Sequence, residues 1–276
     1  MQKILSIIFR SCQIQLHYHF QGEEITTYIE YQGDFHMALS RVQLDMNDVK
    51  VLFVDLNYPQ KSRAILHYYG EICRSFAPKS VIKYISFDSF LNPNEVTYHL
   101  SGDIKTETVL YYQNKVIAIE NLDLGEGSPG SAKRIFFDTM RYLSSVLSGI
   151  VERTNFSNEL IQRYHLLSSD DISSFTENCS KMEMIDIALL TANFSSVNQY
   201  AYRNFSDRMD EIRYRSEHLL SEIREKPIKL VFSGCLFDKN SIFKEEIVNQ
   251  ISKMGNIVEI CDAGSLIQRY LERNVE

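Results

Sequence analysis

The sequence predicts an α/β fold of two lobes, with a block of helices inserted in the second half. Three observations support this prediction. A strand, a helix and a second strand follow one another between residues 49 and 87. Apolar residues then recur at helical spacing from about residue 131 to residue 225. A buried strand, a glycine and a helix follow at residues 228–254.

The first lobe begins with strands. An apolar and alternating run covers residues 3–20, a turn follows at 21–24, and residues 25–31 complete a predicted β-hairpin. A short helix is expected at 34–41. The segment VKVLFVD at 49–55 is apolar almost throughout, which is typical of a strand buried on both faces.

A βαβ unit and a second hairpin follow. Apolar side chains recur at helical spacing within residues 60–76, and VIKYISF at 81–87 is the next apolar strand, so its two strands should be parallel. The second hairpin is predicted from strands at 106–112 and 116–119, joined by a turn at 113–115.

The segment LDLGEGSPGSAKR is the glycine-dense stretch of the chain and predicts a hinge. We therefore expect an N-terminal lobe at 1–124 and a C-terminal lobe at 125–276. The second lobe should contain helices at 135–151, 158–165, 170–176, 182–192 and 197–225, then a strand at 228–232, a helix at 241–254, a strand at 257–261 and a last helix from Ser265.

Composition excludes several classes of function. A net charge of -7 gives no general attraction to nucleic acid or to an anionic membrane surface. No window approaches the roughly 20 apolar residues of a membrane span, and no cleavage site follows the N-terminal apolar run, so no signal peptide is expected. The five scattered cysteines predict reduced thiols in the cytoplasm, without a disulfide framework or a zinc cluster.

Gly234 raises a specific question, because it lies between an apolar strand and a helix in KLVFSGCLFDKN. Glycine supplies a backbone conformation that other residues avoid, which a simple strand-to-helix turn would explain. Alternatively, bare backbone at the carboxyl end of a strand lets a nucleotide approach closely. The sequence leaves both explanations open.

Five segments resemble motifs of the actin, hexokinase and heat-shock-chaperone superfamily, ASKHA, whose duplicated ribonuclease H-like fold clamps ATP between two lobes. SGDIKTETVLYYQNKVI resembles its second phosphate-binding hairpin, and KLVFSGCLFDKNSIFKEEI its adenosine motif. LGEGSPGSAKRIFFDTMRYL is similar to the Gly-Glu-Gly-Ser run of acetylglucosamine kinases and dehydratase-activating ATPases. VKVLFVDLNYPQKSRAILHYYGEIC resembles the strand, proline and helix of the first lobe. The closing DAGSLIQRYLE is also similar to the end of those kinases.

The resemblance implies ATP binding and a set of site residues. The nucleotide-binding residues would be Arg10, Ser11, Gly102, Gly125, Gly127, Ser128, Ser233 and Gly234. Asp55 and Asp103 would be the catalytic carboxylates. The resemblance also places Gly102 and Gly234 on facing lobes, with the nucleotide between them.

The first hairpin departs from the family pattern. Members that transfer phosphate carry an Asp-x-Gly turn there, and the aspartate organises Mg²⁺. This chain has Phe9, Arg10 and Ser11 at that place. Arg10 can pair with a phosphate but cannot hold a metal, so Mg²⁺ and phosphotransferase or ATPase activity stay open. The alternative is a non-catalytic member that acts as an assembly or regulatory partner, of another protein or of a second copy.

Two other patterns compete. RYRSEH places Arg213 and His218 at the spacing of the Arg-x4–6-His motif of HEPN ribonucleases, although those domains are helical to the end and this motif precedes a strand. His17 and His19 lie two apart in a strand and so face the same side, but no third metal ligand is evident. We therefore expect no metal site.

Overall fold

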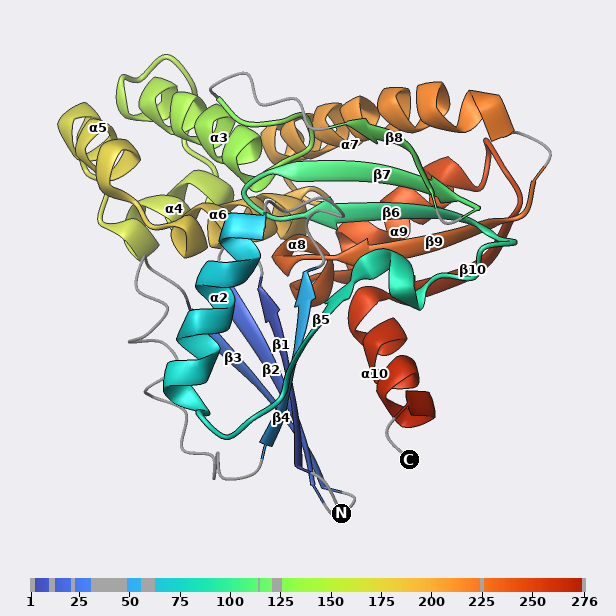
Figure 1. The fold of residues 1–276 in the computed structure, drawn as a ribbon. Coiled ribbons are helices and arrows are strands. Elements are labelled where there is room, and N and C mark those ends of the chain that lie inside the picture. The colour runs from blue at the N-terminus through green and yellow to red at the C-terminus, as the bar shows by residue number, and fades with distance from the viewer. Residues whose placement is uncertain are drawn as a thin grey trace. The chain divides into compact units, whose positions relative to one another are not determined.

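The structure is a computed structural model, which describes residues 3–9, 13–20, 23–30, 49–55, 63–113, 115–120, 126–223 and 226–274 (Figure 1). The chain forms two compact units. Unit 1 comprises residues 1–92 and 266–276, and unit 2 comprises residues 93–265. The boundary between the units differs from that between the lobes expected at 1–124 and 125–276. The reason is that the second hairpin shares a sheet with the C-terminal strands.

Unit 1 is built on a five-stranded sheet of order β3-β2-β1-β4-β5. Its strands are β1 (Lys3–Phe9), β2 (Gln13–Phe20), β3 (Glu23–Glu30), β4 (Val49–Asp55) and β5 (Ile82–Ser86). Helix α2 (Arg63–Phe76) connects β4 to β5, which are parallel as expected. In the central strand β1, Leu5, Ile7 and Ile8 are fully buried, which places apolar side chains on both faces of the sheet.

The C-terminus returns to unit 1. A short 3₁₀ helix, η1 (Phe87–Phe90), follows β5, and the chain ends with helix α10 (Ala263–Asn274). The ring of Phe90 packs edge to face on Tyr270, with 5.0 Å between the ring centroids. This contact joins the two segments of unit 1 that are far apart in sequence.

Unit 2 contains a second five-stranded sheet, of order β10-β9-β6-β7-β8. Its strands are β6 (Val96–Gly102), β7 (Thr106–Tyr112), β8 (Lys115–Glu120), β9 (Ile228–Ser233) and β10 (Ile257–Asp262). Every residue of the central strands β6 and β9 is buried. Strand β10 lies at an edge and alternates between exposed and partly buried residues, as expected for an edge strand.

The two sheets have the same topology. In each, the first three strands form antiparallel neighbours, the fourth strand lies parallel to the first, and the fifth lies parallel to the fourth. The order 3-2-1-4-5 is therefore repeated, once in each unit. This repetition confirms the duplicated, two-lobed α/β fold that the sequence and the resemblance predict.

Five helices are inserted between β8 and β9, which confirms the helical block expected in the second half. They are α3 (Ala132–Leu147), α4 (Asn155–Tyr164), α5 (Ser169–Asn178), α6 (Lys181–Phe194) and α7 (Gln199–Leu220). Each helix has an N-cap residue whose side chain accepts a backbone N–H of the first turn. In order, these N-cap residues are Ser131, Thr154, Ser168, Ser180 and Asn198. An apolar cluster that includes Phe136, Leu143 and Phe156 joins α3, α4, α5 and α6.

Some predicted elements were wrong in detail. The run at 3–20 is two antiparallel strands, β1 and β2, and the pattern alone did not reveal the turn that the resemblance placed near residues 9–11. Strand β6 was missed. The helix expected at 241–254 is preceded by a separate short helix, α8 (Cys235–Lys239), and α9 (Ser241–Ile251) begins after Asn240. The helix expected at 34–41 lies outside the described residues.

Candidate functional site

Three turns of unit 2 meet at the carboxyl ends of β6 and β9. They are residues 102–106 between β6 and β7, residues 127–132 before α3, and residues 233–235 between β9 and α8; we call them the turn cluster. The Thr106 N–H donates to Ser128 Oγ at 2.6 Å, across 22 residues of sequence. The Cys235 N–H donates to Asp103 Oδ1 at 2.5 Å, across 132 residues. Three segments that are far apart in the sequence, each assigned nucleotide-binding residues by the resemblance, therefore lie next to one another.

Gly234 answers the question that its position raised. Its φ is +101°, and a Cβ there would lie 2.4 Å from the carbonyl oxygen of Gly102. Strands β6 and β9 are parallel neighbours, with Ser101 opposite Ser233, so the two turns leave the sheet side by side. Glycine is needed because the backbones touch, a requirement internal to the fold.

The two glycines therefore do not lie on facing lobes, as the resemblance implied: both belong to unit 2. Gly102 has a packing reason of its own, since a Cβ there would lie 2.5 Å from a ring carbon of Phe237. Phe237 in turn packs on Phe232, with 4.9 Å between the ring centroids.

Asp103 is at the centre of the turn cluster and is 2% exposed. Its carboxylate accepts the Cys235 N–H, and its carbonyl accepts the Ala132 N–H at 3.0 Å. The residue thus holds the other two turns against its own. The catalytic role expected for Asp103 stays a prediction, and the geometry gives this carboxylate a structural use.

The glycine-dense segment enters the cluster through buried residues. Gly127 has a φ of +105°, and a Cβ there would approach Ser131 Oγ at 2.8 Å. Ser128 and Ser131 are fully buried. Ser131 accepts the Arg134 N–H at 3.3 Å and so begins α3. The turn before α3 therefore packs directly on the hairpin of β6 and β7.

Thr106 is a candidate that the sequence analysis missed. It is 1% exposed, and within the described parts of the chain its hydroxyl has no hydrogen-bond partner. Buried hydroxyls without a partner are uncommon. The sequence could have suggested Thr106, because it lies three residues after Asp103 in a hairpin that resembles a phosphate-binding one. Next to it, Lys105 is exposed.

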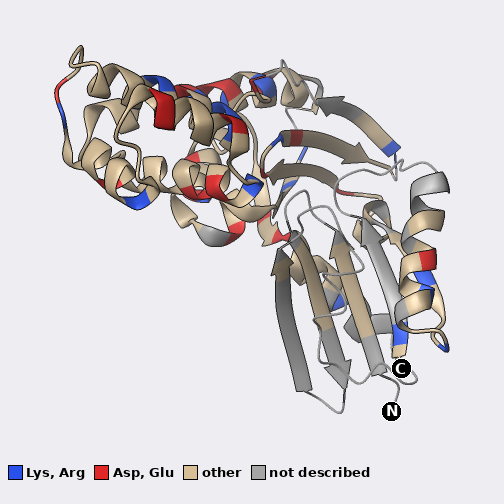
Figure 2. Ribbon diagram, turned by 90° about the vertical axis from the view of Figure 1, so that its left-hand side faces the viewer, with Lys and Arg blue, Asp and Glu red and all other residues tan. Residues whose placement is uncertain are grey.

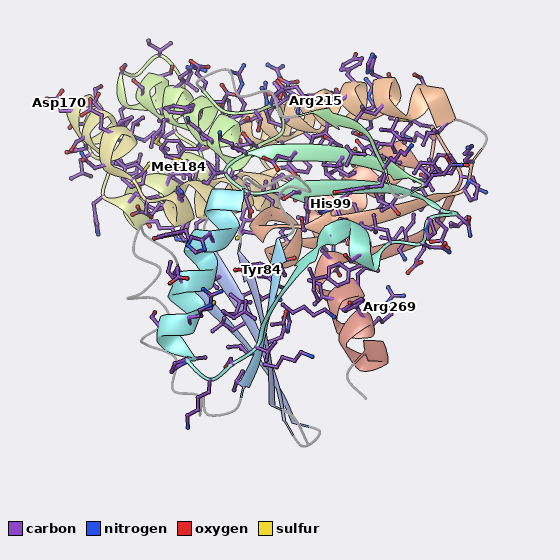
Figure 3. The ribbon with its side chains drawn as sticks, in the orientation of Figure 1. Tyr84, His99, Asp170, Met184, Arg215 and Arg269 are labelled. Atoms are coloured by element: carbon purple, nitrogen blue, oxygen red, sulfur yellow. The ribbon has the colours of Figure 1, made fainter. Side chains whose placement is uncertain are left out.

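A buried polar pair supports the cluster from within the sheet. His99 of β6 lies on the central strand (Figure 3), and its Nε2 is 2.8 Å from the Ser233 hydroxyl. Both residues are 2% exposed. Ser233, expected to contact a nucleotide, uses its hydroxyl to join β9 to β6.

Of the remaining predicted residues, the structure describes Asp55, which belongs to unit 1. Arg10, Ser11 and Gly125 lie outside the described residues. Asp55 is the last residue of β4 in unit 1, where its backbone pairs with Phe9. In the repeated topology Asp55 occupies the place that Ser233 has in unit 2, the end of the fourth strand. Both are positions where ligands of open α/β sheets commonly bind.

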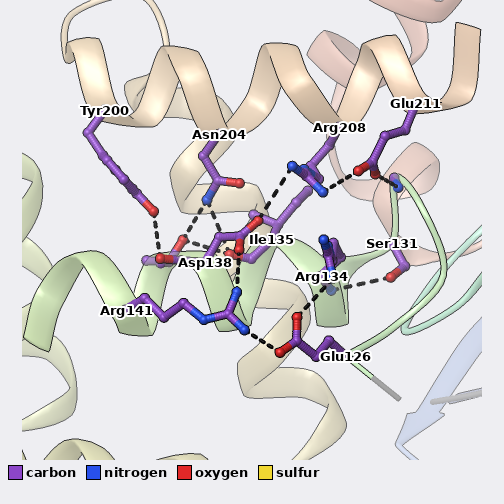
Figure 4. Close-up of polar contacts among 12 residues, drawn as sticks. Glu126, Ser131, Arg134, Ile135, Asp138, Arg141, Tyr200, Asn204, Arg208 and Glu211 are labelled. Atoms are coloured by element: carbon purple, nitrogen blue, oxygen red, sulfur yellow. Dashed lines mark hydrogen bonds and ion pairs between the residues drawn. The ribbon is translucent and has the colours of Figure 1, made fainter. Parts of the chain in front are cut away.

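A network of charges surrounds the turn before α3 (Figure 4). Glu126 pairs with Arg134 at 2.9 Å and with Arg141, and Arg141 pairs with Asp138 at 2.9 Å. On α7, Arg208 pairs with Glu211, whose carboxylate also accepts the Gly130 N–H at 3.0 Å. Figure 2 shows basic and acidic residues interspersed over these helices.

An open groove of about 560 Å³ runs along this network between α3 and α7. Asp138, Arg141 and Arg208 line it, together with Tyr142 and Tyr200. The two tyrosine rings are stacked with 3.8 Å between their centroids, and Tyr200 donates its hydroxyl to the Asp138 carbonyl at 2.5 Å. Burial raises the pKa of Tyr200, so this hydroxyl stays a donor.

The competing patterns have local partners. On α7, Arg213 pairs with Asp210 at 3.1 Å and with Glu217 at 3.4 Å, as residues on a solvated helix commonly do. His17 lies 2.8 Å from the amide of Gln15. Among the residues that the structure covers, no group of three His, Cys, Asp or Glu side chains is placed to hold a metal ion.

None of the helices in the described parts of the chain combines the length and the apolar character that crossing a bilayer requires.

Comparison with known proteins establishes the fold. No protein-family model matches the sequence, and no curated protein sequence matches it. A putative N-acetylglucosamine kinase from Porphyromonas gingivalis superposes with a TM-score of 0.67, at 14% identity over 100% of both chains. A putative N-acetylglucosamine kinase from Chromobacterium violaceum gives 0.63, at 9% identity over 93% of this chain and 94% of that one.

A third solved structure was determined with ligands. A ROK family glucokinase from Streptomyces griseus, in complex with glucose and AMPPNP, gives a TM-score of 0.57 at 9% identity, over 94% of this chain and 93% of that one. At such identities the likeness shows the fold alone.

Proposed function

We propose that this chain, which has the ASKHA fold of the sugar kinases, binds ATP at the turn cluster. The observation that carries the proposal is the meeting of three turns at the carboxyl ends of neighbouring parallel strands. The turns after β6 and β9 extend side by side from the carboxyl ends of two parallel strands, the edge of an open α/β sheet at which ligands commonly bind.

The chemistry of the cluster suits a phosphate chain. Phosphate oxygens bind best to donors that approach without bulky side chains, and the cluster contains Gly102, Gly127 and Gly234. The buried Thr106 hydroxyl offers a further donor, and the exposed Lys105 offers a positive charge. Helix α3 begins at the cluster and directs its positive end toward it. The Streptomyces glucokinase of similar fold was solved with AMPPNP, which supports the proposal that this chain binds ATP.

We propose that phosphoryl transfer is slow or absent. Transfer depends on positioning and on neutralising charge, for which kinases use a metal bridging the β- and γ-phosphates. The first turn of this chain, Phe9-Arg10-Ser11, contains no carboxylate, and Asp103 is engaged with Cys235. Asp55 remains as a proposed base. We keep the cytoplasm as the proposed location, since none of the cysteines in the described part of the chain, Cys73, Cys179, Cys235 and Cys261, forms a disulfide.

Calorimetry and a coupled ADP assay test this proposal. We expect saturable ATP binding that changes little when EDTA removes Mg²⁺, and ADP release at or below the detection limit. Fast Mg²⁺-dependent turnover would contradict the second part and would direct attention to Asp55. An absence of binding to any nucleotide would leave the second candidate, a non-catalytic partner protein or homodimer, which the engaged Asp103 favours.

The ribonuclease alternative has its own test. Since Arg213 is paired with Asp210 and Glu217, we expect no RNA cleavage that depends on His218. Cleavage by the purified protein that disappears in His218→Ala, and is kept in an Asn240→Ala control, would establish the alternative.

A further inference from the structure

The turn before α3 is anchored to α7 at Gly130. The Gly130 N–H donates to Glu211 Oε2 at 3.0 Å. Gly130 has a φ of +73°, and a Cβ there would lie 2.4 Å from a side-chain carbon of Ile212. The turn therefore lies flat on α7, with consecutive residues of the helix providing a polar and an apolar contact.

Glu126, the residue just before the turn, is connected to the same helix by a series of ion pairs (Figure 4). Glu126 pairs with Arg141, and Arg141 pairs with Asp138 at 2.9 Å. Asp138 lies 3.7 Å from Arg208, which pairs with Glu211. The series begins next to the turn, at Glu126, and ends on it, because the Glu211 carboxylate also accepts the Gly130 N–H.

Burial distinguishes the two ends. The Arg208 and Glu211 side chains are 12% and 29% exposed, whereas those of Arg141 and Glu126 are 56% and 45% exposed. Exposed ion pairs contribute little because water and salt screen them. A hydrogen bond to a charged acceptor in a shielded place contributes more. Of the two connections from this segment to α7, the link from Glu211 to Gly130 is therefore the stronger.

We propose that Glu211 is a positioning residue for the nucleotide site. It holds the Gly130 N–H, and the turn so held presents Ser128, whose hydroxyl accepts the Thr106 N–H of the phosphate hairpin. Helix α7 thereby sets the geometry of the turn cluster without touching the ligand. This inference rests on the proposed function.

Two substitutions of Glu211 distinguish the effect of its side-chain length from the effect of its charge. Glu211→Asp keeps the charge that pairs with Arg208 but shortens the side chain by one methylene, so it falls short of Gly130. Glu211→Gln keeps an oxygen that reaches the Gly130 N–H but loses the charge. The control is Glu217→Ala, which removes a carboxylate of the same helix whose ion pair, at 3.4 Å, is with Arg213.

The experiment measures ATP affinity by calorimetry, amide exchange of residues 126–131 in the free protein, and the melting temperature. We expect Glu211→Asp to weaken ATP binding about tenfold and to speed exchange at Gly130 about tenfold. Glu211→Gln should stay within about threefold of the wild type in both, and Glu217→Ala should leave both unchanged. A merely structural role would lower the melting temperature while leaving the affinity intact.

Two results would overturn the inference. If the wild type binds ATP and Glu211→Asp binds it equally well, the positioning role alone is wrong. If the wild type binds no ATP, the proposed function is overturned, and this role for Glu211 with it. Amide exchange distinguishes the cases further, because unchanged exchange at Gly130 in Glu211→Asp would show that the turn is not anchored by this residue.

Discussion

Glycine residues with positive φ differ in this chain by what lies next to them. Gly234 (φ +101°) touches the carbonyl of Gly102, whereas Gly149 (φ +74°) has nothing within 4 Å of the position of a Cβ. A side chain strains the backbone at both positions, but it collides with neighbouring backbone only at Gly234. Comparing Gly234 with Gly149 therefore distinguishes the cost of backbone strain from the cost of a collision with neighbouring atoms.

We predict that Gly234→Ala lowers the free energy of unfolding by about 3 kcal/mol or more, since strain and overpacking add. Gly149→Ala should cost about 1 kcal/mol, from strain alone. Urea denaturation of the two variants measures both values. Equal losses would mean that the contact between Gly234 and Gly102 does not limit this turn.

Burial governs the ionisation of Cys73, which is 1% exposed. It raises the pKa of this thiol from 9.0 to about 12. At a pH between 9.0 and about 12, the thiol is thus protonated in the folded protein and ionised in the unfolded chain. Its contribution to stability is complete below pH 9 and is lost as the pH rises through about 12.

We predict that the free energy of unfolding falls by about 1–2 kcal/mol more between pH 8 and pH 10.5 in the wild type than in Cys73→Ala. Urea titrations at the two pH values provide the measurement. Parallel losses in the two proteins would show that the thiol ionises alike in the folded and unfolded states.

At this scale the sequence predicted which residues are unusual, but not why. Gly234 was identified from its place after a strand, and Gly102 from the resemblance of its segment to a phosphate-binding hairpin. Their contacts with Phe237 and with each other depend on the pairing of β6 with β9. Glu211 was missed, because one glutamate on a charged helix looks like any other until the turn that it contacts is known.

At the scale of elements, the helices of the insert begin where their side chains dictate. In α5, the Ser168 hydroxyl accepts the Asp171 N–H at 3.2 Å, and the Asp171 carboxylate accepts the Ser168 N–H at 2.8 Å. The hydrogen bond from the Ser168 hydroxyl lowers the pKa of Asp171. This reciprocal arrangement satisfies donors that a helix start otherwise leaves to water.

We predict that Ser168→Ala lowers the free energy of unfolding by about 1 kcal/mol, the usual value of an N-cap. Ser173→Ala is the matched control, because Ser173 is exposed within the same helix and alanine there should be neutral or slightly stabilising. Thermal denaturation followed by circular dichroism compares them. A control variant as unstable as Ser168→Ala would argue against the capping interaction.

Elements with a clear period were predicted well, and irregular ones were not. The five inserted helices follow the 3.6-residue spacing of apolar residues and are observed within a few residues of their expected bounds. Strand β6 was missed because VTYHLSG mixes polar and apolar residues, and its polar side chains are buried by pairing, as His99 is with Ser233. Asn240 divides α8 from α9 by capping the second helix, with its side chain accepting the Ile242 N–H at 2.7 Å.

For the whole molecule, the repeated strand order is the main structural fact. In both sheets of order 3-2-1-4-5, the fourth strand lies parallel to the first, so their carboxyl ends meet at the same edge. The sequence suggested this duplication only through its resemblance to ASKHA proteins, because the two halves share no visible repeat. The resemblance assigned residues of all three turns to one nucleotide site, but their direct contacts with one another could not be predicted, since these join residues up to 132 positions apart.

The central claim is that the turn cluster binds ATP, and amide exchange with and without ATP tests it most directly. We predict slower exchange at residues 102–106, 127–132 and 233–235 when ATP is present, and no change in α4 and α5, which pack on α6 and α3. Protection limited to α4 and α5, or no protection under saturating ATP, would contradict the claim.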